Sequence, residues 1–225
     1  MVFFGILGLN SNPTWLAMVF SSAMGSNSVF SPSFRQQYNG STRGYMGQDT
    51  ALPNSVSYST PRLGGVVGTL TVQAGEGSGN GANYNANVVY RGGPLVLTAG
   101  MARLEHQPTP SAPGALDQDV FIVGGSYDFT VVKVFAQYTT FENKATKLEI
   151  KTPHLGVTAP LGSGEFQLAW AEGKNSGSST AKRTTTSLGY YHNLSRRTGV
   201  YSMFVSDKVN VGTANSYALG VRHTF

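Results

Sequence analysis

Polar and apolar residues alternate with a period of two, in segment after segment, from residue 54 to the end of the chain. The segment NYNANV at 83–88 is one example, and FQLAW at 166–170 is another. Successive side chains of a β-strand point to opposite faces, so this period predicts strands with one apolar and one polar face. Its repetition predicts an all-β fold.

The connections between the predicted strands alternate between tight turns and longer polar loops. The tight turns lie at 61–65, 91–94, 128–131, 160–164 and 194–198, and the loops at 75–82, 105–118, 141–147, 173–182 and 207–215. This spacing leaves about eleven strands of roughly ten residues each, the length that crosses a bilayer at a tilt. Membrane barrels place short turns on one side and long loops on the other, whereas a soluble sandwich has no reason to sort them. We therefore predict an antiparallel transmembrane β-barrel.

Aromatic residues near the ends of the predicted strands agree with this interpretation. They are Tyr127, Phe129, Tyr138, Trp170, Tyr190, Tyr201 and Phe225. On the apolar side of a barrel such rings form girdles at the level of the lipid headgroups. The alternative is that aromatic residues are simply enriched in strands.

Composition excludes several other classes of protein. Only 12% of the 225 residues are charged, against about 25% in ordinary soluble domains. The formal net charge of +5 is spread thinly, whereas a nucleic-acid-binding protein concentrates Lys and Arg on one face, so we expect no nucleic-acid partner. The absence of cysteine excludes disulfides and cysteine-ligated metals. The four histidines lack metal-ligand spacing, and no nucleophile elbow or phosphate-binding loop occurs. We expect no enzyme, no cofactor and no metal ion.

Three segments carry a resemblance to a known family. The C-terminal YALGVRHTF resembles the last strand of Gram-negative general porins, in particular the trimeric sixteen-stranded type. NSVSYSTPRLGG at 54–65 is similar to the segment that leaves the constriction loop of these porins. NLSRRTGVYSMF at 193–204 is similar to their penultimate hairpin.

The resemblance implies a division of the chain into two parts. Residues 1–53 show no sustained alternation and take the place of a truncated start followed by the pore-constriction loop. Residues 54–225 supply antiparallel β-barrel strands, about eleven of the family's sixteen. We therefore expect the C-terminal two-thirds of a porin, whose initial MVFFGILGL is an artefactual start, and an open sheet that leaves strand edges unpaired in lipid.

The resemblance also implies two sets of charged residues in the pore. The constriction set is Arg35, Arg43 and Asp49, and the pore-wall set is Arg91, Lys133 and Arg222. A surplus of positive charge in a narrow aqueous pore attracts anions, which predicts a modest anion preference. The alternative for each basic residue is a solvated position on the rim.

The last strand has a second implied role. Tyr217, Leu219, Val221, His223 and Phe225 share one face and resemble the signal read by the barrel assembly machinery. A strand that simply closes the barrel is the plainer alternative.

The predicted function is a water-filled diffusion channel for small hydrophilic solutes and anions. We expect an integral protein of the outer membrane of a Gram-negative bacterium, in contact with outer-membrane lipid and forming a homotrimer. Two alternatives remain open at this point. One is a soluble or surface-exposed β-sandwich that binds a ligand, and the other is an outer-membrane barrel enzyme.

Overall fold

In the computed structural model the described residues are 54–75, 81–105, 117–177 and 180–223. They form eleven β-strands in one sheet. The strands are β1 (Ser55–Ser59), β2 (Val66–Gln73), β3 (Asn83–Gly92), β4 (Leu95–Leu104), β5 (Gln118–Asp128), β6 (Lys133–Asn143), β7 (Leu148–Leu161), β8 (Gly164–Ser176), β9 (Lys182–Asn193), β10 (Thr198–Val209) and β11 (Gly212–His223). The predicted constriction loop within 1–53 lies outside the described residues.

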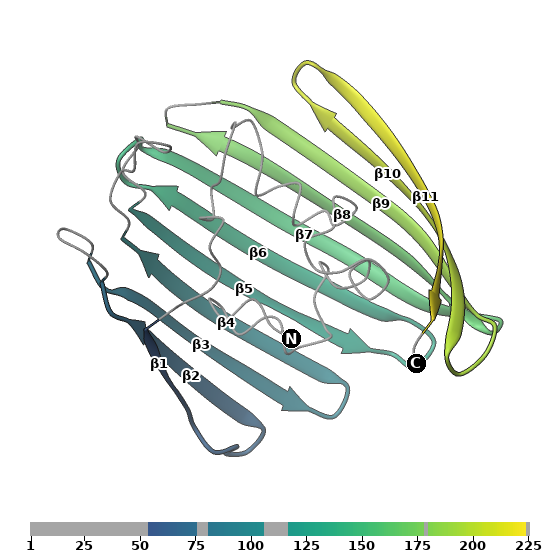
Figure 1. Ribbon diagram of the computed structural model, residues 1–225, viewed down its shortest axis with the longest axis horizontal. Helices are drawn as coiled ribbons and strands as arrows, with labels where there is room; N and C mark the ends of the chain where they lie inside the picture. The colour runs from purple at the N-terminus through teal and green to yellow at the C-terminus, as the bar shows by residue number, and fades with distance from the viewer. Residues whose placement is uncertain (1–53, 76–80, 106–116, 178–179, 224–225) are drawn as a thin grey trace.

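The order of the strands in the sheet is their order in the chain, and each neighbouring pair is antiparallel (Figure 1). The strands lie side by side from β1 at one edge to β11 at the other. The all-β antiparallel prediction is therefore confirmed. A search of the described residues for a helix long and apolar enough to span a membrane found none.

Tight and longer connections alternate as predicted from β1 to β5, but the alternation does not hold throughout: four residues join both β5 to β6 and β6 to β7, and only two join β10 to β11. Two residues, 93–94, join β3 to β4, while 105–117 join β4 to β5. The predicted loop at 207–215 is wrong, because β10 and β11 continue through it to a two-residue turn at 210–211. Asp207 and Lys208 are polar but pair in register with Ala214 and Thr213, so the hairpin extends past its apolar part.

Pro153 lies inside β7 without shifting its register. It pairs with Tyr138 of β6 on one side. On the other side the ladder to β8 runs through Lys151 and resumes at His154, with no pair at 152 and 153. Proline has no N–H to donate, so two rungs are missing while the strand stays continuous. The strand therefore needs no bulge.

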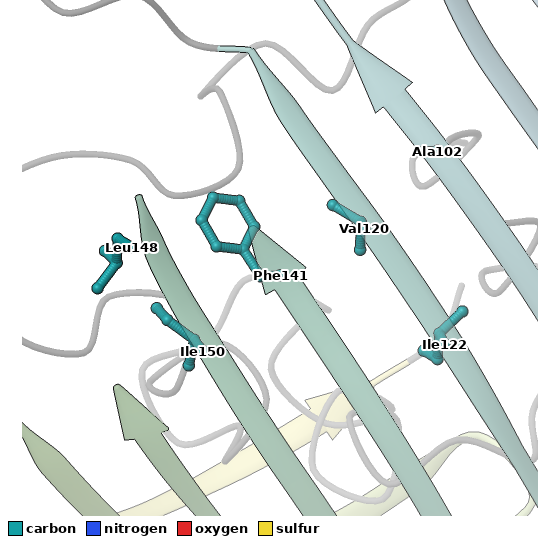
Figure 2. Packing of buried hydrophobic residues seen from close by; sticks show 6 residues of the cluster. All are labelled: Ala102, Val120, Ile122, Phe141, Leu148 and Ile150. Atoms are coloured by element: carbon teal, nitrogen blue, oxygen red, sulfur yellow. The ribbon is translucent and has the colours of Figure 1, made fainter. Parts of the chain in front are cut away.

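One face of the sheet is concave, and we name it the inner face. It holds a cluster of buried apolar residues on β4 to β7, drawn in Figure 2: Ala102, Val120, Ile122, Phe141, Leu148 and Ile150. A second cluster joins Phe135 of β6, Ala169 of β8 and Met203 of β10. Strands two apart lie roughly 9–10 Å from each other in a sheet, so these contacts require the sheet to curl around this face. The opposite face is the outer face.

A polar inner face as the candidate pore lining

The inner face carries mostly polar side chains, and these are buried. Its buried polar residues are Thr71, Gln73, Asn83, Asn85, Asn87, Thr98, Gln118, Ser126, Asn143, Thr152, His154, Thr158, Gln167, Asn175, Thr185, Ser187 and Asp207. They occupy alternate positions of the strands, as the period of two in the sequence predicts. The concave side of this sheet is therefore lined with hydroxyl and amide groups.

The outer face has the opposite character. Large apolar side chains stand exposed on it, from Val56 at 76% on β1 to Leu219 at 83% on β11. Cross-strand partners such as Leu168 and Leu188 build a continuous apolar band. In water this arrangement would expose a large apolar surface, which soluble monomers avoid. A sheet that buries polar groups and exposes apolar ones has the polarity of a barrel wall in lipid.

Hydrogen bonds on the inner face connect neighbouring strands. Asn83 Nδ2 donates to Gln73 Oε1 at 2.8 Å, and the hydroxyls of Ser57 and Thr71 are 2.7 Å apart. The Gln118 amide and the Thr98 hydroxyl, although buried, have no partner among the described residues. Buried polar groups need a partner or water, so this lining suits a water-filled interior.

A buried ion pair lies on the inner face near the long-loop ends of β9 and β10. Arg183 Nε donates to Asp207 Oδ1 at 2.8 Å, and its second nitrogen contacts the other carboxylate oxygen. Thr185 Oγ1 also donates to Asp207, at 3.0 Å. The side chains of Arg183 and Asp207 are only 13% and 6% exposed. The two charges cancel locally, and sequence analysis missed the pair because its members are far apart in the chain.

The predicted pore-wall residues share the inner face and its tight-turn end. Arg91 pairs with Val96 beside the β3–β4 turn, and Arg222 pairs with Gly199 at the end of β11. Lys133 begins β6 opposite Asp128, with its ammonium 5.5 Å from the centre of the Phe135 ring. These three cations lie on well-separated strands and do not form one cluster. Their role in a pore stays a prediction.

The predicted constriction residues Arg35, Arg43 and Asp49 lie outside the described residues. The structure therefore leaves their role as a prediction.

The predicted assembly signal occupies the outer face of β11. Tyr217, Leu219 and Val221 pair with Phe204, Ser202 and Val200 of β10. His223 Nδ1 lies 2.8 Å from the Thr198 hydroxyl. Phe225 lies outside the described residues.

Tyr201 lies on the inner face, so its predicted place in an outer girdle is wrong. It packs against the cluster of Phe135 and Met203. In β10 these alternate positions face inward although they are apolar, since Met203 and Val205 are buried there. The period of two separates the faces of a strand but does not say which face is lipid-facing.

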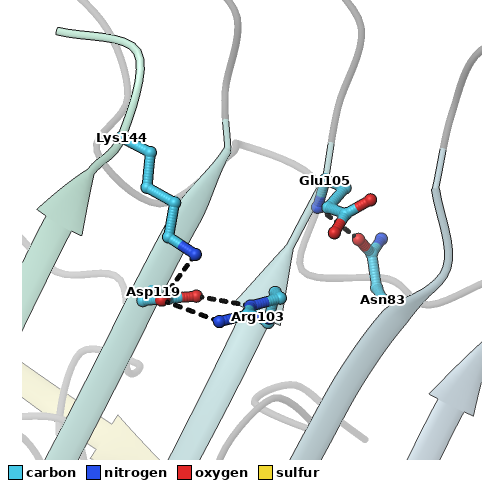
Figure 3. Close-up of polar contacts among 5 residues, drawn as sticks. All are labelled: Asn83, Arg103, Glu105, Asp119 and Lys144. Carbon is cyan, nitrogen blue, oxygen red and sulfur yellow. Dashed lines mark hydrogen bonds and ion pairs between the residues drawn. The ribbon is translucent and has the colours of Figure 1, made fainter.

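A row of ion pairs on the outer face is a feature that sequence analysis missed. It lies at the long-loop ends of β4 to β9, beyond the apolar band. Figure 3 shows Asp119 between Arg103 and Lys144, at 2.9 and 2.8 Å. The row continues with Lys151–Glu149, Lys174–Glu172 and Lys182–Glu172. The sequence did contain a signal for this row: near the strand ends, charged residues replace apolar ones at the alternate positions that face outward.

Comparison with known proteins identifies the family. Residues 6–223 match the family described as Gram-negative porin. The chain belongs to the Gram-negative porin family. This porin is 33% identical over 181 residues to outer membrane porin protein 32 of Delftia acidovorans, which covers 75% of the chain and 50% of that protein. The chain thus spans about half the length of that curated relative.

Solved structures agree with the family. The anion-selective porin from Comamonas acidovorans aligns with a TM-score of 0.63 and 28% identity, over 76% of this porin and 59% of that chain. OmpF of Salmonella typhi, in complex with daunomycin, aligns with a TM-score of 0.60 and 15% identity, over 76% and 62% of the two chains. The second likeness concerns the fold alone.

The family assignment confirms the barrel class and the outer-membrane location. The β-sandwich alternative is wrong, because the described strands form a single sheet of porin topology. The family and the relatives are channels, which fits the expectation that the chain is not an enzyme. Among the described residues no group of three or more His, Asp or Glu side chains could hold a metal ion.

Proposed function

We propose that this porin forms a water-filled diffusion channel for small hydrophilic solutes, with a modest preference for anions. The observation that carries the proposal is the polarity of the sheet. Buried Asn, Gln, Ser and Thr line the concave face, and exposed apolar residues cover the convex one. A wall of this kind separates lipid from water and leaves an aqueous path along its inner face.

The charges on the inner face support the anion preference. Its strands carry four cations (Arg91, Lys133, Arg183 and Arg222) and three acids (Asp128, Glu165 and Asp207). Arg183 and Asp207 neutralise each other. Without this pair, three cations and two acids remain, which gives a net charge of +1 (three minus two). The turn residues Arg196 and Arg197 are not included in this count. Fixed positive charge in a narrow pore raises the local anion concentration. The solved relative named as an anion-selective porin is consistent with this balance.

Further parts of the proposal concern partners. We infer a homotrimer, a constriction formed by Arg35, Arg43 and Asp49, and delivery by the barrel assembly machinery through the end of β11. One structural neighbour, OmpT of Vibrio cholerae, is described in a trimer form. The exposed apolar face of Tyr217, Leu219 and Val221 is compatible with recognition by a second protein during assembly.

The experiment uses the porin extracted from outer membranes and inserted into planar bilayers. Stepwise conductance increments are expected, and under a KCl gradient the zero-current potential should have the sign of an anion-preferring pore. The triple variant Arg91→Gln, Lys133→Gln and Arg222→Gln should move this potential toward cation preference. The control is Lys208→Gln, which removes an exposed charge from the outer face of β10 and should leave the potential unchanged.

Two results would contradict the proposal. Absence of conductance from correctly folded protein would exclude the channel. A cation-preferring potential in the wild-type protein would exclude the charge argument while leaving the channel intact.

A further inference from the structure

A cavity of about 310 Å³ opens on the inner face at the tight-turn end of β8 to β11. The β9–β10 turn contributes Arg196 and Arg197, and β11 contributes Arg222. Glu165 of β8 and Tyr191 of β9 also line the cavity. Arg222 also belongs to the predicted pore-wall set, whereas the predicted constriction residues are not among the described residues that line this cavity.

The charge of the cavity is positive. Three guanidinium groups face one carboxylate, a formal balance of +2. Glu165 Oε1 accepts a hydrogen bond from Gln167 Nε2 at 2.6 Å, so part of its acceptor capacity is occupied. No ion pair within the described part of the chain includes Arg196 or Arg197. Arg196 and Arg197 are neighbours in the chain, both are exposed and both line the cavity, so an anion bound there would offset the repulsion between their charges.

The turn that carries the arginines is well fixed. Ser195 Oγ accepts hydrogen bonds from the backbone N–H groups of Arg197 and Thr198, at 3.2 and 3.0 Å. The backbone N–H of Leu194 also donates to the Thr198 carbonyl at 2.9 Å. The Arg196 and Arg197 backbone therefore has a defined position, which lowers the cost of ordering their side chains around a ligand.

One of the residues that line the cavity, Tyr191, places its ring over a glycine. A Cβ atom at Gly199 would stand 2.3 Å from Tyr191 Oη, so the ring occupies the space that a side chain at position 199 would need. Gly199 pairs with Arg222 on its other side. The missing side chain at Gly199 thus makes room for the Tyr191 ring that lines the cavity.

We propose that this cavity binds a phosphate group, free or carried by a small solute, at the tight-turn mouth of the pore. Guanidinium groups offer paired N–H donors that match the oxygens of a phosphate, and arginine is the side chain best suited to this contact. The volume is at the small end of the range for ligand sites, which suits a phosphate and excludes a nucleotide-sized ligand. The site's part in permeation rests on the proposed channel function, whereas phosphate binding itself does not.

Calorimetric titration of the detergent-solubilised porin with inorganic phosphate at low ionic strength tests the binding. The double variant Arg196→Gln and Arg197→Gln should weaken phosphate binding at least tenfold. The matched control is Arg62→Gln in the β1–β2 turn, an exposed arginine at the same end of the barrel but outside the cavity. It should bind phosphate as the wild type does. Glycerol phosphate in a second titration shows whether the free or the carried group binds more tightly.

Equal phosphate affinity in the double variant and the control would overturn the proposal, as would no binding to the wild type at millimolar phosphate. A parallel experiment adds phosphate to one side of a bilayer that conducts chloride. Phosphate on the tight-turn side should reduce the current at lower concentration than phosphate on the other side, and the double variant should lose this difference. If no current appears at all, the channel proposal fails while the titration still decides the phosphate site.

Discussion

The ring of Tyr201 on β10 lies over Gly220 on β11, so closely that a Cβ atom at Gly220 would stand 2.4 Å from its Cζ and Oη atoms. The two residues form a directly opposed pair on the inner face. One strand earlier the Tyr191 ring also covers Gly199, but from a diagonal position, since Gly199 itself pairs with Asn193. A tyrosine ring over a cross-strand glycine covers backbone that the glycine leaves bare and helps to fix the register of the strands.

Replacing Gly220 by alanine should therefore displace the Tyr201 ring. We expect the Gly220→Ala variant to lose about 1–3 kcal/mol of stability, the usual cost of overpacking. Urea unfolding in lipid vesicles, followed by tryptophan fluorescence, measures the change. The control is Gly68→Ala, where an added Cβ meets its nearest neighbour at an ordinary 3.7 Å and should have little effect. Equal unfolding midpoints for the two variants would show that the ring moves freely.

Breaking the Arg183–Asp207 pair should affect both stability and selectivity. Asp207→Asn leaves a buried guanidinium unpaired, which costs about 3 kcal/mol and should make the zero-current potential more anion-preferring. Arg183→Gln should cost a similar amount and move the potential in the opposite direction. The double variant should recover much of the stability, because it leaves no uncompensated charge.

The control for this pair is Asp119→Asn on the outer face, where Arg103 is 53% exposed. Solvent screens this ion pair, so its loss should shift the unfolding midpoint less than Asp207→Asn does and leave selectivity unchanged. Matching effects of Asp207→Asn and Asp119→Asn on the potential would argue against an aqueous path along the inner face.

Because the outer face is expected to contact lipid, the stability cost of a charged residue on it should depend strongly on the depth of that residue in the bilayer. Leu155 is exposed in the middle of β7, and Leu155→Arg should cost about 2–4 kcal/mol in a bilayer. Val211 in the β10–β11 turn is 95% exposed and lies beyond the apolar band, so Val211→Arg should cost almost nothing. Urea unfolding of both variants in the same vesicles makes the comparison. A tolerated arginine at 155 would mean that this face does not contact lipid.

The orientation of the barrel is testable because the chain has no cysteine. In intact cells a bulky maleimide, too large for the pore, should label Val211→Cys at a long-loop end. It should reach Val131→Cys, in the β5–β6 tight turn, only after the outer membrane is permeabilised. The reverse labelling pattern would invert the assignment of the two ends.

Much of the fold could be predicted from the sequence, because the period of two is a local signal. Alternation in segments such as 83–88 is enough to place a strand and to separate its two faces. Three of the tight turns, at 61–65, 91–94 and 160–164, were also accessible, since their Gly and Pro residues constrain the backbone locally. The length of β10 was not, because Asp207 and Lys208 look like loop residues until their partners on β11 are known.

The candidate site was harder to predict from the sequence, because its contacts also depend on which residues of neighbouring strands pair. The Arg183–Asp207 pair and the phosphate cavity each join residues from different strands, and their contacts depend on register. Register follows from the whole hairpin and not from any short segment. Tyr201 shows most clearly that the alternation does not say which face points to lipid, because the apolar residues on its side of β10 face inward.

A strand order identical to the chain order has a consequence for how the protein is built. Each new strand finds its partner in the hairpin just completed, so no segment has to wait for a distant one or thread past it. A sheet that grows in this way has only two open edges at any moment, whatever its length. Its backbone polar groups are satisfied one rung at a time, which lets insertion into lipid keep pace with folding.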